Sequence, residues 1–165
     1  MPRLTWQAAE LVRTGSETAS ARTLSFQVPG WPERKVVEHD FEWLRELIRS
    51  WSPDWRMTDD YFNPVKAALS DPQRLRAAMG YYRAIPRLPF SMETWQFLFK
   101  PIQVPALVIC GANDGCVLPQ TFRDSEHLYA DGYELHEIPA VGHFMHLEAP
   151  ARFNGKVGEF LKKGV

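Results

Sequence analysis

Residues 104–115 read VPALVICGANDG, an unbroken apolar run that leads directly into a loop carrying one acid, Asp114. The run from Val104 to Cys110 predicts a strand, because a short apolar run with β-branched residues is typical of a strand buried on both faces of a sheet. Residues 133–138 predict a second strand, and residues 139–148 a second loop that contains His143. Because functional groups of an open α/β sheet gather beyond the carboxyl ends of its strands, we expect Asp114 and His143 to meet there.

Helices are expected on either side of the second strand. A helical stretch ending near residue 130 should join the two strands, and a closing helix should begin near Pro150. The closing helix has apolar residues at helical spacing, which we expect to be buried: Phe153, Val157, Phe160 and Leu161. Strands that alternate with helices predict an α/β fold with a parallel sheet.

The first 99 residues have a helical period wherever a period can be read. One helix should follow Asp40, with one apolar face: Phe41, Leu44, Leu47, Ile48 and Trp51. A second should be capped by Ser70 or Asp71, with Pro72 in its first turn and an apolar stripe: Leu75, Ala78, Met79 and Tyr82. Pro53 and Pro64 predict short helices joined by ordered loops between them.

Composition and charge exclude several classes of protein. The chain has 165 residues, 45% of them hydrophobic, which is enough for an ordinary core. Its 19 basic and 20 acidic residues form no long run of one sign, so we expect no nucleic-acid partner. The longest apolar run is far shorter than the about 20 residues that span a bilayer, so no membrane association is expected.

Two cysteines and the lack of a leader pattern at the N-terminus predict a cytoplasmic protein. His39, His127 and His136 show no metal-ligand spacing and are expected at the surface. We therefore expect neither a metal nor another cofactor.

An acid after one strand and a histidine after the next resemble the last two members of an α/β-hydrolase triad. The resemblance rests on residues 105–109 and Asp114, on the Gly142-His143 pair, and on the helix opened by Pro150. It implies a partial α/β-hydrolase fold, in which a helical cap at residues 1–99 precedes the last two β/α units of the parallel sheet, residues 100–165.

By this resemblance His143 is the general base, and Asp114 holds its tautomer and stabilises the imidazolium that forms. The alternative is that Asp114 caps a turn and His143 is an ordinary loop histidine. His146 is a second candidate for the base, although no glycine precedes it.

The cap resembles that of epoxide hydrolases in two places. Residues 80–83, GYYR, resemble the aromatic-Tyr-Arg signature of those caps, and residues 26–30, FQVPG, resemble an earlier segment. Tyr82 is thereby a candidate catalytic proton donor that polarises an epoxide oxygen. Those enzymes use two cap tyrosines, whereas residues 18–26 contain none, and Tyr82 also falls on the apolar stripe of a helix, where it could simply be packed.

No segment of the sequence matches the G-x-S-x-G turn, or its aspartate equivalent, that supplies the nucleophile. Gly111 and Gly115 have the right separation, but Asn113 lies between them. Two strands also leave an apolar sheet edge without a neighbour. We expect a chain that is inactive alone and forms a homo-oligomer or joins a complementing N-terminal chain.

Three functions follow from these patterns. The first is hydrolysis of a small apolar ester, epoxide or related substrate by a site that this chain completes with its acid and histidine. The second is a non-catalytic ligand-binding or protein-interaction module derived from such a hydrolase. The third is catalysis by the acid and histidine alone acting on water, which lacks an evident oxyanion hole.

Overall fold

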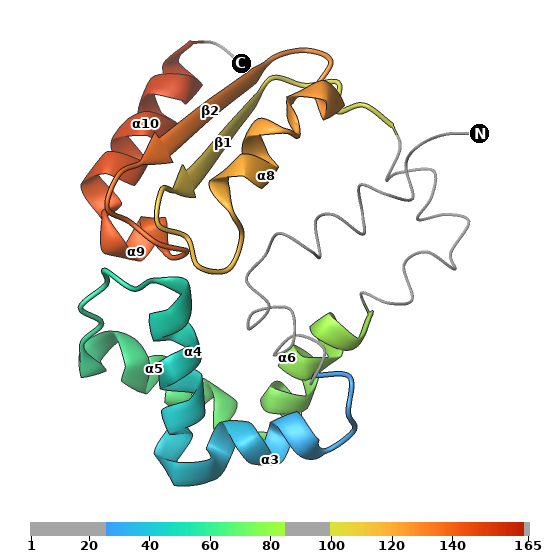
Figure 1. Cartoon of the computed structure of the whole chain (residues 1–165), viewed down its shortest axis with the longest axis vertical. Coiled ribbons are helices and arrows are strands. Elements are labelled where there is room, and N and C mark those ends of the chain that lie inside the picture. The colour runs from blue at the N-terminus through green and yellow to red at the C-terminus, as the bar shows by residue number, and fades with distance from the viewer. Residues whose placement is uncertain (1–25, 85–99, 164–165) are drawn as a thin grey trace. The chain divides into compact units, whose positions relative to one another are not determined.

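The computed structural model describes residues 26–84 and 100–163, and Figure 1 shows the course of the chain. These residues form two compact units. One, here called the sheet unit, consists of Ser50–Trp55 and residues 100–163. The other, the helical unit, consists of residues 26–49 and 56–84. The predicted boundary at residue 99 falls at the end of a stretch outside the described residues.

The sheet unit is built on two parallel strands, β1 (Ala106–Gly111) and β2 (Tyr133–Ile138). Their register pairs Ala106 with Tyr133 and Gly111 with Ile138. The bounds of β2 are those predicted, whereas β1 begins two residues later than predicted. Pro105 has no N–H to give to the ladder, so the first donor is Ala106, which bonds to the Gly132 carbonyl at 3.0 Å.

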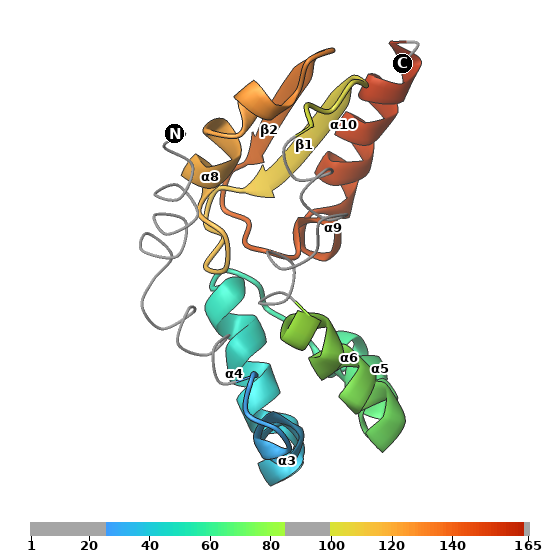
Figure 2. The ribbon, with the colours of Figure 1, turned by 90° about the vertical axis from the view of Figure 1, so that its right-hand side faces the viewer.

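Helices lie on both faces of the strands, with α8 (Pro119–Arg123) on one side and α10 (Pro150–Lys162) on the other (Figure 2). The single helix predicted before residue 130 is two short ones, α8 and the 3₁₀ turn Glu126–Leu128. A further one-turn helix, α9 (Met145–Glu148), lies in the predicted second loop. The fold is therefore the expected β/α alternation, with shorter helices.

Burial in the sheet unit is lower than predicted. In β1 only Cys110 and Gly111 are buried, and the residues before them are half-buried. Leu161 of α10 is 65% exposed, and the other predicted core residues of that helix are only partly buried. Two strands offer too little surface to cover a helix of 13 residues completely. The buried core is small and lies at the carboxyl ends of the strands: Ile138, Val141 and Ala149.

Within the described residues the helical unit contains four helices and one 3₁₀ turn: α3 (Trp31–Val37), η1 (Glu38–Phe41), α4 (Glu42–Trp51), α5 (Asp59–Leu69) and α6 (Pro72–Ala84). The last two residues of α4, Ser50 and Trp51, belong to the sheet unit. The helix predicted after Asp40 is α4. The chain kinks immediately before it, because His39, Asp40 and Phe41 all have positive φ. A short helix was predicted between the two longer ones, and α5, with Pro64 inside it, is such a helix.

The α6 helix is capped by Asp71, whose carboxylate accepts the N–H of Gln73 at 2.8 Å. Ser70, the alternative cap, donates its hydroxyl back to the Lys66 carbonyl instead. The predicted apolar stripe is confirmed at Leu75 and Met79, which are buried. Within the described residues, no helix is both long and apolar enough to cross a membrane.

Candidate active site

The loop that follows β1 holds Asp114 with its carboxylate turned inward. One carboxylate oxygen, Oδ1, accepts the backbone N–H groups of Cys116 at 2.7 Å and Val117 at 3.0 Å. Only 1% of the side chain is exposed. Because two backbone donors fix Oδ1, the second oxygen, Oδ2, has a defined direction in which to accept another hydrogen bond.

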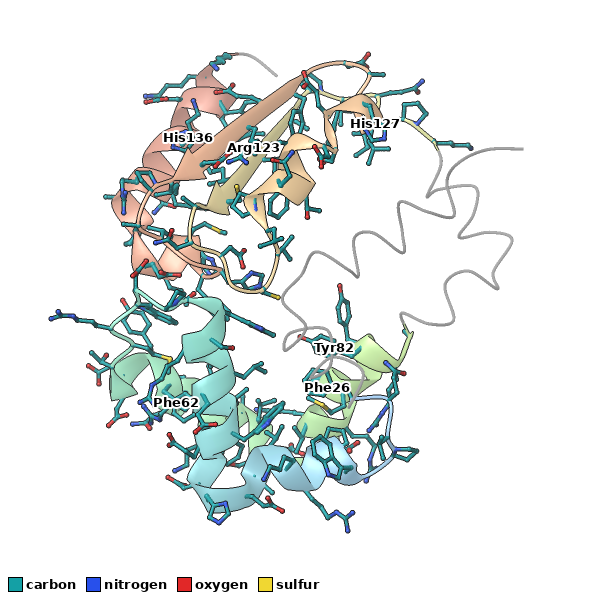
Figure 3. The ribbon with its side chains drawn as sticks, in the orientation of Figure 1. Phe26, Phe62, Tyr82, Arg123, His127 and His136 are labelled. Atoms are coloured by element: carbon teal, nitrogen blue, oxygen red, sulfur yellow. The ribbon has the colours of Figure 1, made fainter. Side chains whose placement is uncertain are left out.

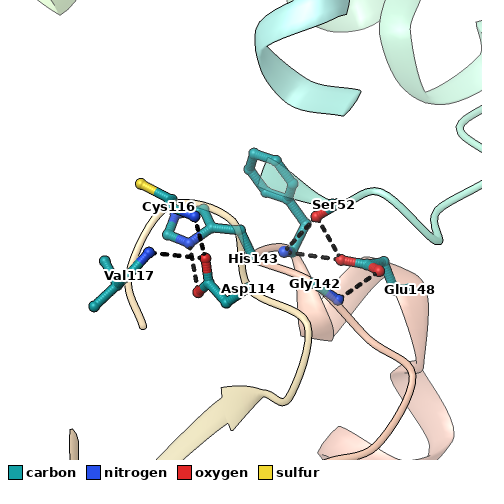
Figure 4. Close-up of polar contacts among 8 residues, drawn as sticks. Ser52, Asp114, Cys116, Val117, Gly142, His143 and Glu148 are labelled. Carbon is teal, nitrogen blue, oxygen red and sulfur yellow. Dashed lines mark hydrogen bonds and ion pairs between the residues drawn. The ribbon is translucent and has the colours of Figure 1, made fainter. Parts of the chain in front are cut away.

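His143 occupies that direction. Its Nδ1 lies 2.9 Å from Asp114 Oδ2, and 32% of its side chain is exposed (Figure 4). An ionised carboxylate can only accept hydrogen bonds, so Nδ1 donates to Asp114, and Nε2 is the ring nitrogen left to act as a base. The structure therefore brings together the acid and the histidine that the sequence places after successive strands.

A segment far away in the sequence connects the two loops. The carbonyl oxygen of Trp51, within the Ser50–Trp55 segment of the sheet unit, accepts the N–H of Gly115 at 3.0 Å and that of His143 at 3.1 Å. The Trp51 ring also meets the imidazole of His143 edge-on, with 5.3 Å between ring centroids. We call Ser50–Trp55 the bridging segment.

The bridging segment passes so close to both loops that two glycines are required. A Cβ atom on Gly115 would lie 2.1 Å from the carbonyl oxygen of Ser50, and one on Gly142 would lie 2.4 Å from the Cα of Ser52. Both contacts are with backbone, which cannot rotate away as a side chain can. The glycine before His143 thus has a steric reason that sequence spacing alone did not reveal.

Two polar residues that the sequence analysis did not single out support the histidine loop. Glu148 Oε2 accepts the N–H of Gly142 at 2.9 Å, and Oε1 accepts the N–H of Phe144 at 3.0 Å. The hydroxyl of the buried Ser52 donates to Glu148 Oε1 at 2.7 Å. Figure 4 shows this cluster beside the pair of Asp114 and His143.

The sequence profile of the alpha/beta hydrolase family matches residues 4–156. The chain belongs to the alpha/beta hydrolase family. The match extends over most of the chain, including the Asp114 and His143 loops, and the observed β/α order is that of a partial α/β-hydrolase fold, as predicted.

Known members of this hydrolase family are similar to the chain over part of their length. Epoxide hydrolase srdG of Neurospora crassa is 30% identical over 96 residues, which are 54% of this chain and 27% of that protein. AB hydrolase superfamily protein YfhM of Bacillus subtilis is 26% identical over 141 residues, 83% of this chain and 46% of that protein.

Among solved structures, a mutant of an epoxide hydrolase from Bacillus megaterium has the same fold, with a TM-score of 0.65 at 21% identity. The match covers 93% of this chain and 55% of that one. The chain thus spans about half, or less, of the length of these relatives.

The third predicted site residue, Tyr82, lies in the helical unit, whereas Asp114 and His143 lie in the sheet unit. Its ring packs on Phe26 with 4.6 Å between centroids, and the two side chains adjoin in Figure 3. Its backbone carbonyl accepts the side-chain N–H of Gln27 at 3.0 Å. The two segments that resemble epoxide-hydrolase caps therefore meet each other.

Arg83, the next residue, holds these two segments together. Its Nε donates to the Phe26 carbonyl at 3.0 Å and an Nη to the Val28 carbonyl at 3.4 Å. Both Nη atoms also donate to Glu33, at 2.7 and 2.9 Å. The hydrogen bonds between these two side chains lower the pKa of Glu33 and raise the pKa of Arg83. The arginine of the signature thus has a structural role.

The other candidate groups are placed less favourably. His146 is exposed and packs against Phe153 at 6.1 Å between ring centroids.

The Cys116 side chain, in the loop after β1, is a weak nucleophile. Burial raises the pKa of Cys116 to about 11, and the Asp114 carboxylate adds to the shift, so this thiol stays protonated at neutral pH. No metal-binding group of three or more acidic, histidine or cysteine residues occurs in the part of the chain that the structure describes.

Proposed function

We propose that the chain provides the general base and its orienting acid for the hydrolysis of a small apolar ester, epoxide or related substrate. The observation that carries this proposal is the 2.9 Å bond between His143 Nδ1 and Asp114 Oδ2, made by a buried carboxylate that two backbone N–H groups fix. Membership of the alpha/beta hydrolase family supports it. Fold alone does not determine the substrate, and the proposed substrate class rests on the resemblance to epoxide hydrolases and related family members.

In the proposed reaction a nucleophile from residues outside this sequence attacks the substrate. If it is a serine, Nε2 of His143 takes the hydroxyl proton as the Ser–carbonyl bond forms and gives it to the leaving alcohol as the ester C–O bond breaks. Nε2 then takes a proton from the water that hydrolyses the acyl intermediate and returns it to the serine oxygen. If it is an aspartate, its carboxylate bonds to an epoxide carbon as the C–O bond of the ring breaks and the freed oxygen takes a proton. Nε2 later takes a proton from the water that hydrolyses the ester intermediate and gives it to the diol oxygen that leaves. In both cases Asp114 stabilises the imidazolium.

Tyr82 is the proposed proton donor to an epoxide oxygen, since its segment resembles the cap signature and one relative is named an epoxide hydrolase.

The proposed partner is a second copy of this chain or a complementing N-terminal chain, because the described sheet has two strands and hence two edges. The proposed compartment is the cytoplasm, where the two free cysteines stay reduced. No metal or other cofactor takes part in the proposed reaction.

The test combines this chain with the part of the Bacillus subtilis relative that it does not match, expressed as a separate chain. Short-chain nitrophenyl esters and styrene oxide are the substrates. We expect no turnover by the chain alone and turnover by the pair. His143→Ala should lower kcat about ten-thousand-fold, as loss of a triad member does, and Asp114→Asn should lower it by a similar factor.

His146→Ala is the matched control and should leave kcat unchanged. Turnover by the pair that survives His143→Ala would contradict the proposed role of His143. A chain that binds apolar ligands, and gives no turnover in any combination, would favour the non-catalytic module instead.

A further inference from the structure

The N–H groups on both sides of His143 are taken by one carboxylate. Glu148 accepts the N–H of Gly142 through Oε2 and that of Phe144 through Oε1. The N–H between them, that of His143 itself, goes to the Trp51 carbonyl. Three successive donors of this loop thus have acceptors, and none of the acceptors is His143's catalytic partner Asp114.

Ser52 fixes the carboxylate in turn. Its hydroxyl donates to Glu148 Oε1 at 2.7 Å, and its oxygen is 3.3 Å from the N–H of Phe144. Ser52 is 1% exposed, and a buried hydroxyl without a partner would cost free energy. The bridging segment therefore contributes a hydroxyl to the histidine loop as well as a carbonyl.

Helix capping accounts for only half of this arrangement. Phe144 is the N-cap residue of α9, and the bond from its N–H to Glu148 is similar to the reaching-back half of a capping box, with the acid four residues after the N-cap instead of the usual three. The bond to Gly142 has no such explanation, because Gly142 lies outside the helix on the other side of His143. A carboxylate that spans the histidine fixes the peptide planes on both of its sides.

We propose that Glu148 and Ser52 are positioning residues, which hold the backbone around His143 so that Nδ1 stays on Asp114 and Nε2 stays directed at the substrate. This inference rests on the proposed function of His143. Gly142 has no side chain to restrict its backbone, so the loop needs external anchors. A catalytic group misplaced by about 1 Å can lose about a hundredfold in rate, which gives such anchors a role.

The first measurement needs no turnover. Proton and nitrogen NMR of the imidazole of His143 in the full chain should show a strongly deshielded Nδ1 proton, which Asp114→Asn removes. In Glu148→Ala and Glu148→Gln that proton should exchange with solvent about tenfold faster. Alanine offers no acceptor to the loop, and the glutamine amide offers one oxygen where the carboxylate offers two. Ser52→Ala, a milder change, should have a smaller effect in the same direction.

Glu159→Gln is the matched control, since Glu159 is 69% exposed on α10 and, among the described residues, forms an ion pair with Lys156 alone. It should leave the Nδ1 proton unchanged. Far-ultraviolet circular dichroism identifies any variant that has failed to fold. Should Glu148→Ala be unfolded, Ser52→Ala and Glu148→Gln decide the question.

The second measurement uses the complemented pair of chains. Glu148→Ala should lower kcat about a hundredfold with little change in KM, because substrate still binds but meets a displaced base. If the wild-type pair shows no turnover, the proposed function fails while the NMR result still decides the positioning role. A folded Glu148→Ala and a folded Ser52→Ala that both keep the wild-type Nδ1 proton exchange would overturn the inference.

Discussion

The two units anchor their loops with groups of opposite sign. In the sheet unit, carboxylates of Asp114 and Glu148 accept backbone N–H groups of the site loops. In the helical unit, the guanidinium of Arg83 donates to the carbonyls of Phe26 and Val28. The sign of each anchor follows from which backbone groups the loop leaves unpaired.

The anchors also differ in how their own charge is balanced. Arg83 forms a two-point ion pair with Glu33, and both side chains are about a quarter exposed or less. Glu148 forms no ion pair within the described residues, where N–H and O–H donors hold its carboxylate. Added salt should therefore weaken the helical-unit anchor more than the one in the sheet unit.

The largest effect is expected from Gly142→Ala in the sheet unit. The new Cβ would lie 2.4 Å from the Cα of Ser52, so the bridging segment and the histidine loop must separate. We expect a loss of about 3 kcal/mol in the free energy of unfolding, measured by urea denaturation.

Gly158→Ala is its control, because a Cβ on Gly158 meets nothing within 4 Å. In the interior of α10 this change should stabilise the chain by about 0.5–1 kcal/mol. Equal effects of the two substitutions would contradict the close approach at Gly142.

Arg83→Met should have the next largest effect, since it removes the donors to two carbonyls and leaves the Glu33 carboxylate without its partner. We expect a loss of about 2 kcal/mol in the free energy of unfolding. Arg83→Lys keeps the charge without the planar fork and should fall between. Arg76→Met, at an exposed position of the same helix, should change little, and a comparable loss there would refute the anchor.

The smallest effect is expected at a partly exposed ion cluster of the sheet unit. Hydrogen bonds from Lys156 and Lys163 lower the pKa of Glu134 to about 2, from an ordinary 4.5. Because the folded pKa lies below the unfolded one, the stabilisation is complete above pH 4.5 and disappears as pH falls toward 2. Wild type should therefore exceed Glu134→Gln in melting temperature at pH 7, by a margin that shrinks on acidification. A margin that grows toward pH 3 would be the opposite result.

Strand-end reasoning predicted the central contact of the site. Asp114 and His143 are 29 residues apart, and they meet because parallel neighbouring strands deliver their following loops to the same edge. The bounds of β2 were also predictable, since a turn precedes this strand and Pro139 follows it. The start of β1 was missed because the apolar period does not register that Pro105 lacks a donor.

The anchors of the histidine loop were not predictable in the same way. Ser52 lies 96 residues before Glu148, in a part of the chain with no pattern that relates it to the second strand. Glu148 had no standard local signal, because it lies four residues after Phe144, one position beyond the place of the acid in a capping box. The helix α9, which ends at Glu148, has only four residues, too few to show a helical period in the sequence.

The Trp51 carbonyl, which accepts both Gly115 and His143, has a further mechanical consequence. When two loops are hydrogen-bonded to the same oxygen atom, a displacement of that atom moves both loops in the same direction, and the distance between the loops changes little. A movement of the bridging segment should therefore change the distance between Asp114 and His143 less than it changes the position of either residue. The acid and the base keep their spacing by sharing a reference point rather than by each being rigid.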